Sequence, residues 1–506
     1  MSTQAQERTY GGWRQPPSPG VGPLRLIPTV GLFIGLAVTV LVSMRWGIIP
    51  AAAFVLLALV GATPAVLRTR GRSLYSHWGR RRKWRSHVRK GRNHYRSGLA
   101  GVTPTGARNL PGLLAKVRVW EAVDAFGRDY GLIEIPAIRQ WAVVLRVQAQ
   151  GGALVDQETT DVWVAGWGEY LASLGQEGGI VQVTAVVETI PDAGARLAAH
   201  VAGLIEPGAP EFARQVMAAS AVELPRGVAD TVGYVAITFS ERKLDITRKG
   251  SKDPEAAEAA ALDIGRRLPD LCVDLKDVGA SRGVPMTAED LARRVREAYD
   301  PTSALVHAQL EADGLPVAVD WEDAGPSMHV AAAESYRHDS GLSMTWEAMK
   351  VPPGVVRDSI LQRLVGPLSE VPRKRVALIY RPVDAGDTAA LVDRDYKAAI
   401  NRAGRRKGPV LAHDSADLRA AEQATREEAS GAGVTTLSLL VTATVDAEHA
   451  DQLSKARQAV ERAARGSRFR LAPVFGAQDA AFAAALGIGL SLPDLSVIPS
   501  TVREHL

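Results

Sequence analysis

Two uncharged apolar runs near the N-terminus constrain this 506-residue chain more than any other feature. The first covers residues 26–44 and the second covers residues 48–67, and only three residues separate them. A helix needs roughly 20 apolar residues to cross about 30 Å of hydrocarbon, so each run has the length of a membrane span. The pattern predicts a transmembrane helical hairpin at 26–67. A buried helical hairpin inside a globular core is the alternative.

A strongly basic segment, residues 68–98, follows the second run. It holds twelve Lys and Arg, three His, four large aromatic side chains and no acid. Such residues bind anionic lipid headgroups, and the same residues suit phosphate contacts and base stacking. We therefore predict contact with a membrane surface or with nucleic acid. The predicted contact residues are Arg80, Arg81, Arg82, Lys83, Trp84, Arg85, Arg89, Lys90 and Arg92.

The distribution of charge predicts an orientation for the hairpin. The N-terminal tail, residues 1–25, contains three arginines, and the basic segment flanks the other end, whereas the link between the runs holds only Arg45. An excess of Lys and Arg marks the cytoplasmic side of a membrane. The sequence thus predicts a two-helix, multi-pass plasma-membrane protein with both termini and most of the chain in the cytoplasm.

The remaining chain alternates strand-like and helix-like segments. Strands are expected at 116–124, 130–135, 141–150, 181–189, 232–240, 271–278, 343–350, 374–383, 435–445 and 467–476. Helices are expected at 159–175, 251–268, 287–299, 447–465, after residue 192 and across 384–432, and residues 301–330 look like a linker. This order predicts an α+β fold of ferredoxin-like units, in two regions at 99–330 and 331–506.

A search for catalytic motifs finds none. The chain has no G-x-x-x-x-G-K-[ST] phosphate loop, no H-E-x-x-H and no Cys/His spacing that suits zinc, and its single cysteine, Cys272, excludes an internal disulfide. The run HDSGLS at 338–343 is read as a polar turn before a strand, since residues of a catalytic triad are normally distant in sequence. We expect no enzymatic activity, no cofactor and no metal site.

Several segments resemble proteins of type IV, conjugation-type secretion systems. They are WAVVLRVQAQGGALVD (141–156), GWGEYLASLG (166–175), VVETIPDAG (186–194), RHDSGLSMTW (337–346), RKRVALIYRPVD (373–384) and AAFAAALGIGLSLPD (480–494). The apolar hairpin looks like the small two-helix inner-membrane subunit of these systems. The rest is similar to the N-terminal, non-ATPase half of their traffic ATPase. The combination resembles actinobacterial membrane proteins of conjugation-like gene clusters.

The resemblance implies a structural adaptor that docks a separately encoded ATPase at the membrane within an oligomeric assembly. No motor domain follows Asp494, so ATP hydrolysis is not carried over to this chain. Two other functions stay open. A type VII secretion component also combines two N-terminal membrane helices with an α/β region, and the basic segment suits a membrane-tethered nucleic-acid-binding protein.

Overall fold

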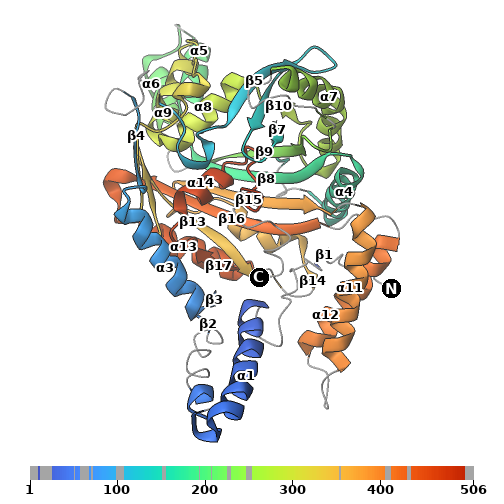
Figure 1. Ribbon diagram of the computed structural model, residues 1–506. Helices are drawn as coiled ribbons and strands as arrows, with labels where there is room; N and C mark the ends of the chain where they lie inside the picture. The colour runs from blue at the N-terminus through green and yellow to red at the C-terminus, as the bar shows by residue number, and fades with distance from the viewer. Residues whose placement is uncertain are drawn as a thin grey trace, which may run out of the picture. The chain divides into compact units, whose positions relative to one another are not determined.

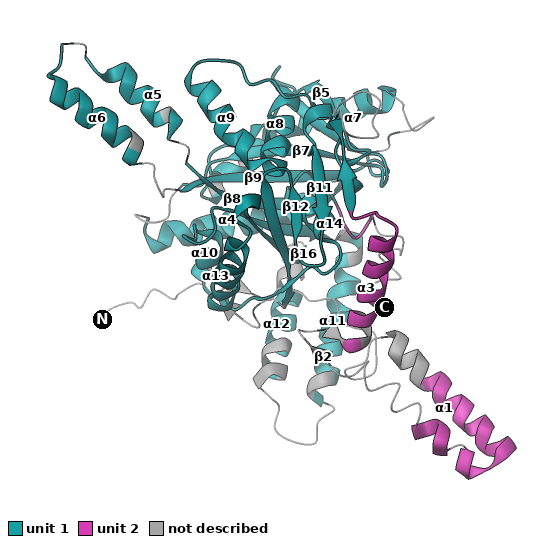
Figure 2. Cartoon of the chain, turned by 90° about the vertical axis from the view of Figure 1, so that its left-hand side faces the viewer, with its two compact units in different colours: residues 1–13, 94–490 teal, residues 14–93, 491–506 magenta. Residues whose placement is uncertain are grey.

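The computed structural model divides the chain into two compact units, which are described separately. One unit comprises residues 1–13 and 94–490, and the other comprises residues 14–93 and 491–506 (Figure 2). The residues described are 10–11, 26–50, 52–56, 68–69, 72–98, 108–150, 155–192, 194–206, 208–224, 229–244, 246, 254–350, 352, 355–383, 385–404, 412–429 and 435–495.

The smaller unit is mainly helical. Helix α1 spans Leu26–Trp46, and α3 spans Leu74–Arg89. Between them, the short strands β2 (Arg68–Thr69) and β3 (Arg72–Ser73) pair antiparallel. The basic segment that the sequence singles out therefore begins as a tight two-stranded ribbon and continues as a helix.

The prediction of a transmembrane hairpin at 26–67 is wrong, because the described helices are not both long enough and apolar enough. Within the described part of the chain, no helix combines the length and the hydropathy that a membrane crossing requires. The described side chains of α1 begin at Phe33, and the second apolar run is described as helix only at 48–50 and 52–56. The predicted multi-pass plasma-membrane location rested on this hairpin and is wrong for the same reason.

The larger unit is built on a thirteen-stranded sheet whose pairings are all antiparallel (Figure 1). In sequence order the strands are β4 (His94–Arg96), β5 (Arg118–Val123), β6 (Asp129–Ile135), β7 (Gln140–Val147), β8 (Ile180–Pro191), β9 (Ala229–Ser240), β10 (Val284–Pro285), β11 (Met328–Ala331), β12 (Tyr336–His338), β13 (Gly341–Lys350), β15 (Arg373–Pro382), β16 (Thr435–Asp446) and β17 (Arg470–Pro473). Strands β1 (Tyr10–Gly11) and β14 (Val355–Val356) pair separately. The α+β class expected from the sequence is the class observed.

Strands from distant parts of the chain meet at the centre of this sheet. The main path runs β4-β11-β12-β13-β16-β15-β8-β9-β7-β6-β5. Strand β8 pairs with β15, so that Glu188 lies opposite Arg375. Residues before 240 and residues after 340 thus contribute to one continuous sheet.

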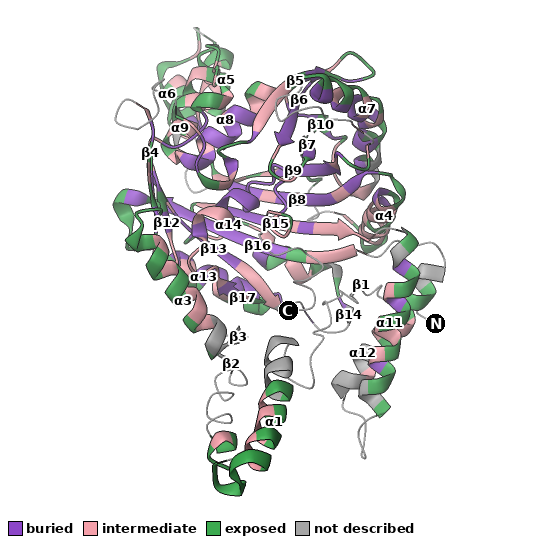
Figure 3. Cartoon of the chain, viewed as in Figure 1, coloured by how far each residue is buried: buried purple, intermediate pink, exposed green. Residues whose placement is uncertain are grey.

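One face of the sheet is apolar and is covered by helices. Helices α4 (Gln157–Gln176) and α7 (Pro254–Val273) pack their apolar sides against alternate residues of β7, β8 and β9. Helices α10 (Gln362–Val365) and α13 (Gln452–Gly466) pack in the same way on β13, β15 and β16. Figure 3 shows the buried residues concentrated along these central strands. Alternation along each strand places the intervening residues on the opposite face.

The opposite face carries polar side chains and is covered by α8 (Ala288–Tyr299), α14 (Gln478–Ala485) and residues 486–491. Gln182 donates to the carbonyl oxygen of Leu490 at 3.1 Å, and Thr238 donates to that of Gly489 at 3.1 Å. A Cβ atom at Gly489 would lie 2.3 Å from the Cβ of Ala142, and Gly489 has φ +86°. Only glycine allows the backbone to approach the sheet this closely.

The other helices lie around the sheet. They are α5 (Ala195–Leu204), α6 (Glu211–Glu223), α9 (Pro301–Ala312), α11 (Ala385–Gly404), α12 (Ala412–Ala429) and the short 3-10 helices η2 (Gly112–Leu114), η3 (Asp274–Val278), η4 (Trp321–Asp323), η5 (Asp358–Leu361) and η6 (Ala447–His449). Figure 2 shows α5 and α6 projecting away from the sheet of their own unit.

Two expected segments differ from the structure. The strand predicted at 271–278 is wrong, because α7 continues to Val273 and is followed by η3. The linker predicted at 301–330 is wrong as well, since it contains α9, η4 and the start of β11. Pro301 occupies the first turn of α9, a position where proline begins a helix.

Candidate functional sites

Helix α3 and the turn after it carry the predicted contact residues of the basic segment. Residues 80–85 and Arg89 lie in the helix, and Lys90 and Arg92 follow it. The exposed members are Arg81, Arg82, Lys83, Arg85, Arg89, Lys90 and Arg92, whereas Arg80 and Trp84 are half-buried. The structure therefore places the predicted residues on one helix and the turn after it, and it leaves most of their charges accessible.

Aromatic rings are interleaved with these charges. The guanidinium carbon of Arg82 lies 5.5 Å from the centre of the Trp78 ring, and Trp78 is 57% exposed. Trp84 and His87 stack with their ring centres 5.8 Å apart. Because α3 contains no acidic residue, a nearby polyanion would relieve the repulsion among its cations. The helix thus has the charge and the ring surfaces for binding a polyanion.

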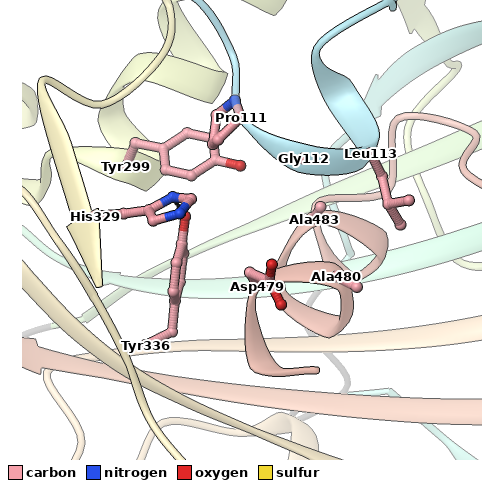
Figure 4. Close-up of a pocket in the computed structure, with 9 residues that line it drawn as sticks. All are labelled: Pro111, Gly112, Leu113, Tyr299, His329, Tyr336, Asp479, Ala480 and Ala483. Atoms are coloured by element: carbon pink, nitrogen blue, oxygen red, sulfur yellow. Dashed lines mark hydrogen bonds between the residues drawn. The ribbon is translucent and has the colours of Figure 1, made fainter. Parts of the chain in front are cut away.

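A small buried pocket lies under η2 in the larger unit (Figure 4). Its volume is about 10 Å³, which is enough for one water molecule. The lining residues are Pro111, Gly112, Leu113, Tyr299, His329, Tyr336, Asp479, Ala480 and Ala483. The hydroxyl of Tyr336 lies 2.7 Å from His329 Nδ1, and burial lowers the pKa of His329 to about 4. The pocket is too small for a substrate.

The HDSGLS run forms the turn between β12 and β13, as expected. His338 Nδ1 lies 2.6 Å from the carbonyl oxygen of Tyr299, so this nitrogen carries the hydrogen and donates it. His338 Nε2 then accepts from the hydroxyl of Ser343 at 2.8 Å. This is the hydrogen-bonding pattern of a nucleophile and its base, yet both side chains are completely buried. Burial lowers the pKa of His338 to about 4. The His338–Ser343 pair is therefore a hydrogen bond of the buried interior.

A buried charge cluster, which the sequence does not predict, lies on the polar face of the sheet. Arg375 Nη2 is 2.6 Å from Glu188 Oε1, and Arg294 Nη2 is 4.0 Å from Glu188 Oε2. Arg294 also lies 3.7 Å over the ring of Tyr234. Burial alone would raise the pKa of Glu188, but the two arginines outweigh it and lower that pKa to about 2. Charged residues inside otherwise apolar strand sequences were the signal that could have revealed this cluster.

Helices α5 and α6 expose apolar side chains. Phe212 is 77% exposed and Leu224, at the end of α6, is 67% exposed. Val216 and Met217 are also exposed, and at 100° per residue these four side chains fall within an arc of about 140° on α6. Leu204, at the end of α5, is 69% exposed. We call these five residues the α6 apolar face. Because α5 and α6 contact each other, these exposed apolar side chains belong to one helical pair, which favours a protein interaction site.

Comparison with known proteins assigns no function to these sites. Residues 17–76 match the model of a family described as a domain of unknown function, DUF8461. This match covers the N-terminal apolar region and reaches the first residues of α3. No curated protein gave a significant match to the chain.

Proposed function

We propose that the protein is a non-catalytic adaptor that docks a separately encoded ATPase of the conjugation type through the α6 apolar face. The observation that carries the proposal is the apolar face itself, led by Phe212 and Leu224. An amphipathic helix that exposes its apolar side can bury that side in a groove of a partner.

The class of partner rests on the sequence resemblance to the non-ATPase half of a traffic ATPase. In the traffic ATPase a motor domain follows that half, and the proposal places the corresponding motor on a second chain. The two expected membrane helices are no part of this proposal. What remains is the α+β body, which holds α5 and α6 away from its sheet (Figure 2).

Co-purification from the native cell tests the proposal. The tagged full-length protein and its Phe212→Asp, Leu224→Asp double variant are isolated, and a P-loop ATPase is sought by mass spectrometry and by its ATPase activity. We expect the double variant to lose most of the bound ATPase, because two buried carboxylates would lack partners at the interface. Phe126→Asp is the matched control, since Phe126 is 69% exposed in the turn between β5 and β6.

Two results would contradict the adaptor function in different ways. Wild-type protein that elutes without any ATPase would remove the proposed partner. Equal recovery of the ATPase by the wild type and the double variant would keep the partner and show that another surface binds it.

Nucleic-acid binding by α3 is a second candidate function, favoured by its exposed cations and by the exposed ring of Trp78. Binding of labelled single-stranded and duplex DNA to the full-length protein is measured over a range of salt concentrations. Replacing Arg81, Arg82 and Arg85 by alanine should weaken binding and reduce the salt slope by roughly 0.7–0.9 for each phosphate that is no longer neutralised. Arg337→Ala, an exposed arginine of β12, is the control. Unchanged binding by the triple variant would exclude α3.

A further inference from the structure

An open cleft of about 550 Å³ lies beside α10 and the C-terminal end of α13 in the larger unit. Its lining residues are Val356, Arg357, Ser359, Ile360, Gln362, Arg363, Gly466 and Arg468. This volume falls in the range of about 300–1,000 Å³ that is common for small-molecule sites. None of these lining residues belongs to the α6 apolar face.

The charge of the cleft is one-sided. Three of the eight lining residues are arginines and none is an acid. Other arginines of α13 have carboxylate partners: Arg457 pairs with Glu334 and Glu461, and Arg462 pairs with Glu370. Within the described part of the chain, neither Arg363 nor Arg468 has an ion-pair partner. Two of the three guanidinium groups at this cleft, those of Arg363 and Arg468, therefore have no carboxylate partner among the described residues.

Buried side chains anchor the backbone beside these arginines. Leu364 of α10 and Phe469 are buried in the apolar core that α13 covers, so the residues on either side are firmly held. The stem of Arg363 lies over Gly466, where an added Cβ would come within 3.3 Å of Arg363 Cδ. Gly466 thus provides the space that positions this guanidinium group. A preorganised side chain loses less entropy when it binds a ligand.

Arg468 is held in a conformation that favours glycine. It follows the last turn of α13 with φ +57°, in the left-handed region. Glycine is the usual residue at this position after a helix, and a larger side chain there is strained. Strained residues of this kind also cluster at ligand-binding and catalytic sites.

We propose that this cleft binds a phosphate-bearing small molecule, with Arg363 and Arg468 as the principal phosphate ligands. The planar guanidinium group matches the oxygens of a phosphate in a bidentate manner, and several arginines together favour a dianion or a polyphosphate over a single carboxylate. Gln362 and Ser359 add polar groups for the remainder of the ligand. The volume accommodates more than inorganic phosphate alone.

Isothermal titration of the full-length protein tests the site, with inorganic phosphate, pyrophosphate and ADP as probes. We expect affinity to rise from phosphate to pyrophosphate, and Arg363→Gln to lower the affinity for pyrophosphate at least tenfold. Arg465→Gln is the matched control, because Arg465 is an exposed arginine of α13 that does not line the cleft. It should bind like the wild type.

Arg468→Gly separates binding from folding. Glycine adopts the observed φ without strain, so this variant should unfold at the same temperature as the wild type or higher. Its affinity for pyrophosphate should nevertheless fall about tenfold. The proposal would be overturned if the wild-type protein binds none of the three probes. It would also be overturned if Arg363→Gln and Arg468→Gly both bind pyrophosphate as tightly as the wild type and Arg465→Gln do.

Discussion

The two faces of the sheet in the larger unit are both buried, but they are stabilised by different means. On the face covered by α4, α7, α10 and α13, apolar side chains pack on apolar side chains, and many substitutions of similar size would serve. On the face covered by α8, α14 and residues 486–491, polar groups meet specific partners, such as Glu188 with Arg375 and Gln182 with the carbonyl of Leu490.

This difference predicts how each face responds to change. Removing one apolar side chain costs only the free energy of its packing and of the cavity it leaves. Removing one partner on the polar face leaves the other buried without a hydrogen bond or a counter-charge, which costs more. The predictions below compare the two faces, beginning with the largest expected effect.

Lowering the pH should destabilise the protein through buried histidines on the polar face. The folded protein keeps His329 and His338 neutral until their pKa values of about 4, whereas the unfolded chain takes up protons near pH 6.5. The stability that these neutral rings contribute is therefore present above pH 6.5 and is lost as pH falls to about 4. Protonation of the two histidines should together lower the free energy of unfolding by roughly 6 kcal/mol over this interval.

Urea unfolding at several pH values measures this loss. His329→Gln should roughly halve the slope of unfolding free energy against pH. A wild-type slope near zero between pH 6.5 and 4 would show that these rings are not held neutral.

Gly489→Ala should disrupt the covering of the polar face. The new Cβ would overlap Ala142, and alanine is strained at φ +86°. We expect a loss of about 4 kcal/mol of unfolding free energy, from overpacking and strain together. Gly168→Ala is the control, since Gly168 lies inside α4 with open space around it, and it should stabilise the protein slightly. Equal stability of the two variants would contradict the close approach of residues 486–491.

Glu188→Gln should lower the unfolding free energy by about 3 kcal/mol at pH 7, because Arg375 and Arg294 would remain buried without a counter-charge. The folded-state pKa of Glu188 is depressed to about 2, so its contribution is present above the unfolded value near 4.5 and disappears as pH falls toward 2. The difference between variant and wild type should therefore vanish in strong acid. A difference that persists at pH 2 would assign the effect to packing instead of charge.

Ile264→Val should have the smallest effect, about 1 kcal/mol, because it removes one methylene from the side of α7 that packs in the apolar core. Thermal unfolding measures it, and no dependence on pH is expected. A loss as large as that of Glu188→Gln would remove the proposed contrast between the faces.

The same contrast explains which parts of the fold could be predicted from sequence. Alternating apolar residues placed β7, β8, β9, β15 and β16 closely, because that pattern follows from burial on a pleated strand. The strand expected at 271–278 is wrong because its apolar residues fit a strand and a helix equally well. Leu268, Leu271, Cys272 and Leu275 are buried together at helical spacing, and Pro269 inside α7 obscures the pattern.

Partners on the polar face could not be predicted. Nothing local in the sequence indicates that Glu188 meets an arginine 187 residues further along, or that His338 donates to the carbonyl of Tyr299. The basic segment could be recognised because twelve cations in one short segment need no tertiary information, whereas its contact with lipid or nucleic acid stays a prediction. The cleft arginines were missed because Arg363 and Arg468 come together only through packing of α10 on α13.

The way residues 486–491 cover the sheet has a consequence for synthesis of the protein. Strands β7, β8 and β9 leave the ribosome early, yet their polar face is completed only when these late residues arrive. Until then the nascent chain exposes unpaired hydrogen-bonding groups and the strand edge that β15 will occupy. Long-range pairing of this kind slows folding and leaves intermediates prone to aggregation. The growing chain is therefore most prone to aggregation until its last strand and covering segment have been made.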